Sequence, residues 1–145
     1  MTANRLAPGG PPRWQQMAVV ALGAGDLLTG ALLVASPATV ERLLGIAPSP
    51  PEAAIFMRWI GLFVAVVGAA YLLPFRWPAG AARLERLRAT LEWTAIVRLA
   101  VAAFVGAGVL SAALPETWCF VGSYDALAAT GQLALLAAWS AHRGL

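Results

Sequence analysis

The residues best suited to chemistry in this chain are four charged side chains set in long apolar stretches: Asp26, Arg58, Arg98 and Asp125. A charged group is expensive to place in a bilayer, so an intramembrane carboxylate or guanidinium is usually paired or functional. Such groups can bind a proton, hold an ion or small polar molecule, or pair with one another. Which of these applies depends on the elements that carry them.

The composition is that of an integral membrane protein. Of 145 residues, 60% are hydrophobic and 12% are charged, whereas a soluble domain carries roughly 25% charged residues. The mean hydropathy is +0.74. The net charge of +3 comes from arginines that lie between the apolar stretches. We therefore attribute it to membrane orientation and expect no nucleic-acid partner.

Four apolar stretches reach the roughly 20 residues that a membrane-spanning helix needs. The sequence predicts an all-α integral membrane protein, an antiparallel bundle of four transmembrane helices over about 16–35, 53–73, 91–113 and 118–140. Residues 15–145 are expected to form this single domain. Residues 1–14 are rich in proline and glycine and are expected to be a disordered arm. A cleavable signal peptide is the alternative for the first stretch, but its apolar run is too long and contains Asp26.

Arginine counts on the two sides of the predicted bundle indicate its orientation. One side has only Arg42, and the other has seven: Arg5, Arg13, Arg76, Arg83, Arg86, Arg88 and Arg143. Because arginine is enriched in cytoplasmic loops, both termini are predicted to be cytoplasmic.

Two connections are expected to contain short interfacial helices. Residues 37–45 have an apolar side and a terminal glycine, and residues 81–90 combine leucines with three arginines. We expect those arginines to contact lipid headgroups: Arg83, Arg86 and Arg88. A solvated, positively charged loop is the alternative.

Small residues should allow the helices to approach closely, since lipid provides little hydrophobic drive between helices. The expected packing residues are Gly61, Ala65 and Gly68 in the second stretch, with Ala102 and Gly106 in the third. Each stretch also places its charged residue on the face that carries small residues. These faces are expected to turn inward.

Depth along the helices suggests which charges meet. The simplest arrangement pairs Asp26 with Arg98, and Asp125 with Arg58. The alternative for Arg58 is that its side chain extends outward to the membrane interface. Gln132 shares a face with Asp125 and is a possible auxiliary polar residue. Glu92 is another, although an i, i+4 surface pair with Arg88 is its simpler role. Whether the Asp/Arg pairs fix helix register or form a functional polar interior stays open at this point.

Catalytic and metal-binding patterns are missing from the sequence. There is one cysteine, Cys119, and one histidine, His142, so no CxxC pair and no cysteine/histidine ligand cluster can form. No Ser/His/Asp set lies in the stretches. We therefore expect no catalytic residues, no metal and no cofactor.

Gly23-x-x-Asp26 and Arg58-Trp-Ile-Gly61-Leu-Phe63, followed by Gly68 and Tyr71, resemble the small four-helix bacterial membrane proteins of the broad DoxX-like group. This resemblance implies a four-helix bundle in the bacterial cytoplasmic membrane, sometimes linked to redox partners. The chain has no cysteine pair and no histidine within a span, which argues against a redox role.

The function expected from these features is that of an accessory or scaffold subunit of a membrane assembly. Its partners would be the lipid bilayer and other membrane proteins or further copies of the chain. The alternative is transport or binding of a small solute, proton or ion by the Asp/Arg interior. A lipid-modifying membrane enzyme is a remote alternative.

Overall fold

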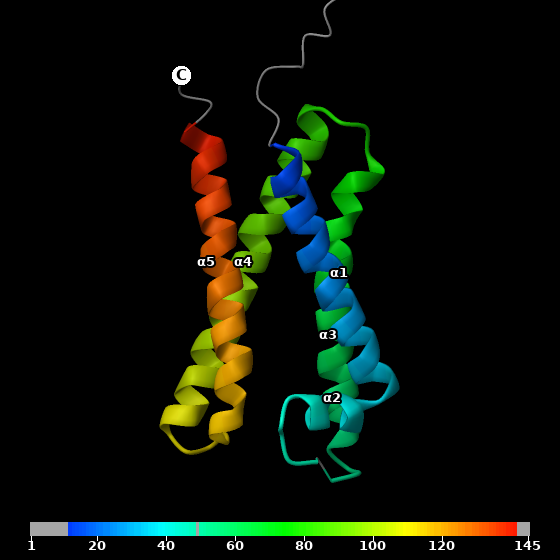
Figure 1. Cartoon of the computed structure of the whole chain (residues 1–145), viewed down its shortest axis with the longest axis vertical. Helices are drawn as coiled ribbons and strands as arrows, with labels where there is room; N and C mark the ends of the chain where they lie inside the picture. Colours follow the sequence, from blue (N-terminus) through cyan, green and yellow to red (C-terminus); the bar gives the residue numbers. More distant parts are fainter. Residues whose placement is uncertain (1–11, 49, 142–145) are drawn as a thin grey trace, which may run out of the picture.

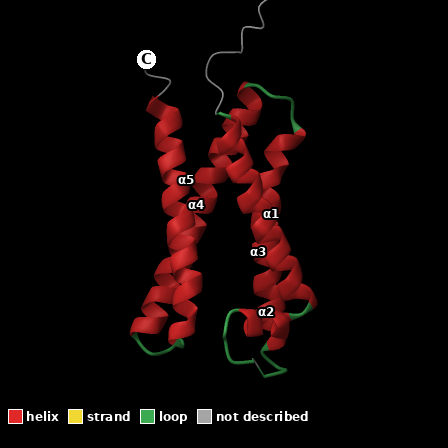
Figure 2. Ribbon diagram, viewed as in Figure 1, coloured by secondary structure: helices red, strands yellow, loops and turns green. Residues whose placement is uncertain are grey.

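The computed structural model describes residues 12–48 and 50–141, and the regular structure in these residues is entirely helical. Four long helices run alternately up and down (Figure 1): α1 (Arg13–Ala35), α3 (Ala54–Leu72), α4 (Ala81–Leu110) and α5 (Cys119–Ala141). The shorter elements are α2 (Pro37–Leu43) and the 3-10 turns η1 (Leu73–Arg76) and η2 (Glu116–Trp118). Figure 2 shows that loops connect them without any strand in the described part of the chain.

Three segments are long and apolar enough to cross a membrane: Arg13–Ala35, Ala54–Arg76 and Ala81–Leu110. The structure therefore confirms an all-helical fold in the described residues, with three helices of membrane-spanning length that suggest a membrane protein. α5 has the same length as α1, 23 residues, but is not among these segments.

Prolines and glycines set several helix boundaries. Pro37 disfavours a helical conformation at Ser36, so α1 ends at Ala35, and Pro37 itself begins α2. Gly45, with φ of +68°, follows α2 in a conformation that suits glycine. The expected N-terminal arm lies outside the described residues except at positions 12–14, where α1 already begins at Arg13.

The largest difference from the predicted elements is in α4. A separate short helix over residues 81–90 was expected before a span at 91–113, but one continuous helix of 30 residues runs from Ala81 to Leu110. No proline or glycine interrupts residues 81–105, so nothing breaks the helix where the amphipathic segment meets the apolar one. The 1–2 connection does contain a short helix, α2.

The four long helices pack as two antiparallel pairs, α1 with α3 and α4 with α5 (Figure 1). Glycines bring α1 and α3 into backbone contact. A Cβ atom added to Gly30 would lie 2.3 Å from the Ala65 nitrogen, and one added to Gly68 would lie 2.3 Å from the Leu27 nitrogen. Only glycine fits at these positions.

Two apolar clusters lie at opposite ends of the molecule. The one nearer the termini draws on all four long helices: Val19, Tyr71, Leu87, Leu91 and Trp139. The other contains Leu33, Val40 and Met57, against which Leu44 and Trp118 pack. Between them, the helices are held together by the polar residues described next.

Candidate functional site: one buried arginine shared by two aspartates

Each of the four long helices contributes to a polar cluster around Arg98. We define the Arg98 cluster as Asp26 of α1, Tyr71 of α3, Arg98 of α4, and Asp125 and Gln132 of α5. Asp125 and Gln132 are seven residues apart, about two helical turns, and therefore share one face of α5. The buried Ala129 lies between them on that face.

All three guanidinium nitrogens of Arg98 donate hydrogen bonds. Nη2 donates to Asp26 Oδ2 and Nη1 to Asp125 Oδ1, and both contacts are also ion pairs. Nε donates to the Tyr71 hydroxyl oxygen at 3.2 Å. Gln132 Nε2 donates to the same hydroxyl, so Tyr71 connects α3 to both α4 and α5. The cluster thus forms a continuous network across the four helices.

Aromatic rings lie beside the guanidinium. Its central carbon is 5.9 Å from the centre of the Tyr71 ring and 5.4 Å from that of Tyr124. A ring face within about 6 Å stabilises a cation by its quadrupole. Both tyrosines therefore favour the charged form of Arg98.

The cluster is enclosed but not balanced in charge. Arg98, Asp26 and Gln132 are 5%, 6% and 2% exposed, and the Asp125 side chain is 13% exposed. Two carboxylates share one guanidinium, so with both ionised the group carries one excess negative charge. Within the membrane, such a charge is costly unless a proton, cation or water compensates it.

The expected pair between Asp26 and Arg98 is formed, whereas the expected pair between Asp125 and Arg58 is not. Asp125 bonds to Arg98 instead. Arg58 is exposed near the start of α3, where it lines a groove of about 260 Å³ with Glu41 and Ser36. The pairing was wrong because depth along a helix does not specify which side of the helix faces which neighbour.

The two auxiliary polar residues have different positions. Gln132 is buried in the cluster, and its Oε1 atom has no hydrogen-bond partner among the described residues. Glu92 is exposed on α4, away from the described bonds of the cluster. Arg88, its expected i, i+4 partner, donates instead to Ser140 Oγ at 3.3 Å.

The small residues also divide into two groups. Gly61, Ala65 and Gly68 lie against α1, with added Cβ atoms on both glycines meeting α1 within 3 Å. Ala102 lies near Gly122 of α5. Gly106 was expected to turn inward but faces open space: a Cβ atom added there would meet nothing within 4 Å.

The three arginines expected at lipid headgroups lie near the start of α4 and contact other residues of the chain. Arg83 Nε donates to the Trp77 carbonyl oxygen at 2.9 Å, and the Arg83 guanidinium lies over the Phe75 ring at 5.6 Å. The Arg86 guanidinium lies 4.2 Å from the centre of the Trp77 ring. Together with the Arg88 bond to α5, these contacts tie the α3–α4 connection to the adjacent helices.

Tyr71 belongs to the Arg98 cluster but was not predicted there, although it is one of the residues that carry the DoxX-like resemblance. It lies three residues after Gly68, and an i, i+3 continuation of the Gly61–Gly68 face would have included it. The bond from Trp139 Nε1 to Gln15 Oε1, between α5 and α1, was missed as well. Trp139 is buried at this contact.

The described residues contain no group of three or more His, Cys, Asp or Glu side chains placed to hold a metal ion. Cys119 is exposed as a free thiol at the start of α5. What the Arg98 cluster can do chemically is hold buried charge, join helices, and bind a proton or small cation at its excess carboxylate.

Comparison of the chain with protein-family models, with curated proteins and with solved structures finds no significant match.

Proposed function

We propose that this chain is a non-catalytic membrane protein that acts as an accessory or scaffold subunit of a membrane assembly. The observation that carries this proposal is the contrast between its interior and its outer faces. All three nitrogens of the buried guanidinium are bonded to the chain itself. By contrast, only 22–28% of the residues in the most apolar stretch of each candidate span are buried within the chain. Most residues of these spans therefore have side chains at least partly exposed to lipid or to other helices.

The outer face of α3 is the proposed contact face. Phe56, Trp59 and Phe63 are spaced at i, i+3 and i+7 and are 68%, 63% and 64% exposed. Aromatic residues at this spacing form one stripe along a helix. Such a stripe can pack against a partner helix by van der Waals contact, which drives association in lipid.

Crosslinking in native membranes tests the accessory role. A tagged full chain is crosslinked in the cells that produce it and then purified, and partner proteins are quantified by mass spectrometry. We expect a membrane protein in fixed ratio to the chain, with its recovery reduced by Phe63→Ala but not by Phe104→Ala, which changes an exposed phenylalanine of α4. A chain recovered as a lone monomer contradicts the proposal.

The membrane placement belongs to the same proposal: four crossings in a bacterial cytoplasmic membrane, with both termini cytoplasmic and a DoxX-like bundle. Two features support it. α5 packs antiparallel along α4, so if α4 crosses the bilayer then α5 crosses it too. In addition, the end of the bundle that holds the start of α1, η1 and the start of α4 carries Arg13, Arg76, Arg83, Arg86 and Arg88.

The shorter elements have proposed positions at the two interfaces. The exposed Leu43 of α2 suits a helix lying on the outer surface. The guanidinium N–H groups that make no hydrogen bond within the protein would contact lipid headgroups from three arginines, Arg83, Arg86 and Arg88.

A second candidate function, proton or cation handling, is favoured by the excess carboxylate of the Arg98 cluster. A proton or monovalent cation bound there would balance the charge, and its release and rebinding could serve transport. Proteoliposomes with an ion gradient and a pH-sensitive dye test this. Flux above that of empty liposomes, abolished by Asp125→Asn but not by Arg58→Gln, would support transport. Flux equal to that of empty liposomes would rule this candidate out.

A further inference from the structure

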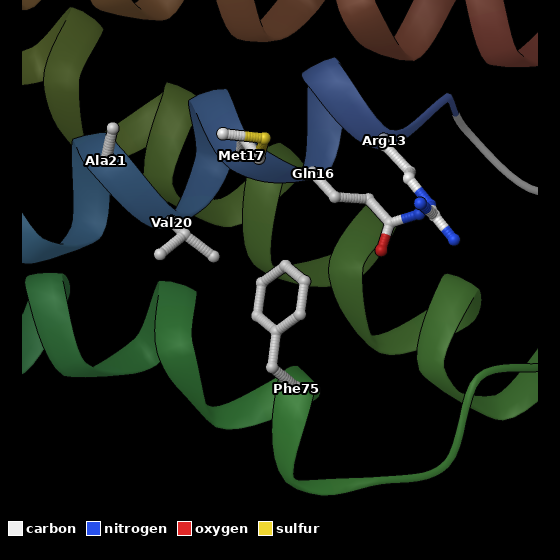
Figure 3. Close-up of a pocket in the computed structure, with 6 residues that line it drawn as sticks. All are labelled: Arg13, Gln16, Met17, Val20, Ala21 and Phe75. Carbon is white, nitrogen blue, oxygen red and sulfur yellow. The ribbon is translucent and has the colours of Figure 1, made fainter.

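A groove between α1 and η1 is separate from the Arg98 cluster. Its volume is about 400 Å³, and its lining residues are Arg13, Gln16, Met17, Val20, Ala21 and Phe75. Figure 3 shows the Phe75 ring pointing from η1 towards α1, with Arg13 and Gln16 at the end where α1 begins. The groove is therefore polar at one end and apolar along the rest of its length.

The apolar part suits a slender hydrocarbon chain. Met17, Val20 and Ala21 are spaced at i, i+3 and i+4, so their side chains form a continuous wall on one face of α1. Phe75 forms the facing wall. Met17 and Val20 are 71% and 38% exposed, so the wall is accessible from outside the bundle.

The polar end suits an anion. Arg13 is exposed and no lining residue is acidic. The first turn of α1 has no acidic residue that would offset the positive end of its helix dipole. Phosphate is bound well by arginine through charge-assisted hydrogen bonds.

We propose that this groove binds one anionic phospholipid, with the phosphate at Arg13 and one acyl chain along Met17, Val20 and Phe75. The arrangement of charge and apolar surface matches that of a lipid, which has its anionic headgroup at one end and its hydrocarbon at the other. Basic pockets between membrane helices on the cytoplasmic side recognise anionic headgroups in this way. The groove belongs to the single chain, so this proposal does not depend on the accessory role.

Native mass spectrometry of the purified full chain tests the proposal. The delipidated protein in mild detergent is titrated with phosphatidylglycerol or phosphatidylcholine, and the population with one bound lipid is measured. We expect one phosphatidylglycerol to bind more tightly than phosphatidylcholine. Arg13→Gln should weaken phosphatidylglycerol binding about fivefold, the effect of one cation near the headgroup. It should weaken phosphatidylcholine binding less, because the choline cation offsets the charge of the phosphate.

Variants that fill the groove separate a lipid from a simple anion. Val20→Trp should fill the groove and block binding of the first lipid of either kind. Met17→Gln, which makes the apolar wall polar without filling the groove, should weaken lipid binding. The matched controls are Arg42→Gln on α2 and Val66→Trp on the exposed face of α3, which should leave binding unchanged. Circular dichroism establishes that each variant is folded.

Three results would overturn the proposal. One is equal binding of the two lipids. Another is an Arg13→Gln variant that behaves like Arg42→Gln. The third is displacement of the lipid by millimolar inorganic phosphate together with no effect of Val20→Trp, which would identify a free-anion site instead.

Discussion

At the scale of single residues, Arg98 is the cation on which two carboxylates depend. Arg98→Gln leaves Asp26 and Asp125 buried without a neighbouring cation, and removing one partner of a buried ion pair costs about 3–5 kcal/mol. We expect this variant to lose most of its folded population in detergent, as measured by thermal unfolding followed by circular dichroism. Arg58→Gln, which changes an exposed arginine, is the matched control and should be within about 0.5 kcal/mol of the parent.

Because the cluster has two carboxylates and one guanidinium, substituting one aspartate should cost less stability than substituting Arg98. Asp26→Asn or Asp125→Asn leaves one carboxylate with one guanidinium, so each should destabilise less than Arg98→Gln. The triple variant with Arg98→Met, Asp26→Asn and Asp125→Asn should recover part of the lost stability, because it leaves no unpaired charge. Single aspartate variants as unstable as Arg98→Gln would contradict the shared-guanidinium arrangement.

Tyr71 provides a second prediction, through a hydroxyl that accepts two hydrogen bonds. Tyr71→Phe leaves Arg98 Nε and Gln132 Nε2 without this acceptor. Hydrogen bonds between membrane helices contribute about 0.6 kcal/mol on average and about 1.7 at most, so we expect a loss of about 0.5–1.5 kcal/mol. The measurement is a double-mutant cycle with Gln132→Leu. Losses that are simply additive would show that the two side chains do not interact.

At the scale of helices, the glycines of α1 have different roles that their sequence does not reveal. Gly30→Ala would force a Cβ atom to within 2.3 Å of the Ala65 nitrogen, whereas a Cβ atom on Gly25 meets nothing within 4 Å. We expect Gly30→Ala to destabilise by about 1–3 kcal/mol through overpacking. Gly25→Ala should be neutral or stabilise by up to about 1 kcal/mol, because alanine favours the helix.

The measurement is thermal unfolding of both glycine variants in the same detergent, since they lie on the same helix and involve the same chemical change. Equal effects at the two positions would contradict the close contact between α1 and α3.

Hydropathy and breaker residues predict the helices of this chain well, because both are local properties. The expected 16–35 and 53–73 match α1 and α3 to within a few residues. The fusion of residues 81–90 with the third span was not predicted, since a change from amphipathic to apolar sequence does not by itself end a helix. What ends a helix is a missing hydrogen bond or a clash, and residues 81–105 contain no proline or glycine to cause one.

The Arg98 cluster was only partly predictable because helix rotation is a tertiary property. Sequence spacing placed Asp26, Arg98, Asp125 and Gln132 on inward faces, and the structure buries or half-buries all four. The sequence spacing could not show that Arg98 faces both aspartates while Arg58 faces away. Gly106 was misassigned for the same reason: a small residue fits both a packed face and an open one.

At the scale of the whole molecule, the two ends differ in charge. The end that holds the start of α1 and of α4 carries five described arginines with two acidic residues, Glu85 and Glu92. The opposite end carries two arginines, Arg42 and Arg58, with three acidic residues, Glu41, Glu52 and Glu116. Because arginine is enriched on the cytoplasmic side of membrane proteins, we propose that the arginine-rich end is cytoplasmic. In this proposed orientation the lipid groove would lie at the cytoplasmic interface and Cys119 at the outer one.

The single cysteine allows this orientation to be measured in intact cells. We expect a membrane-impermeant maleimide to label Cys119, which is exposed at the start of α5, without permeabilisation. In a Cys119→Ser background, Arg76→Cys and Ser140→Cys should be labelled only after permeabilisation, because η1 and the end of α5 lie at the arginine-rich end. Labelling of Cys119 only after permeabilisation would indicate the inverted orientation. Labelling of Cys119 and Ser140→Cys from the same side would show that α5 does not cross the membrane, and would reduce the bundle to three crossings.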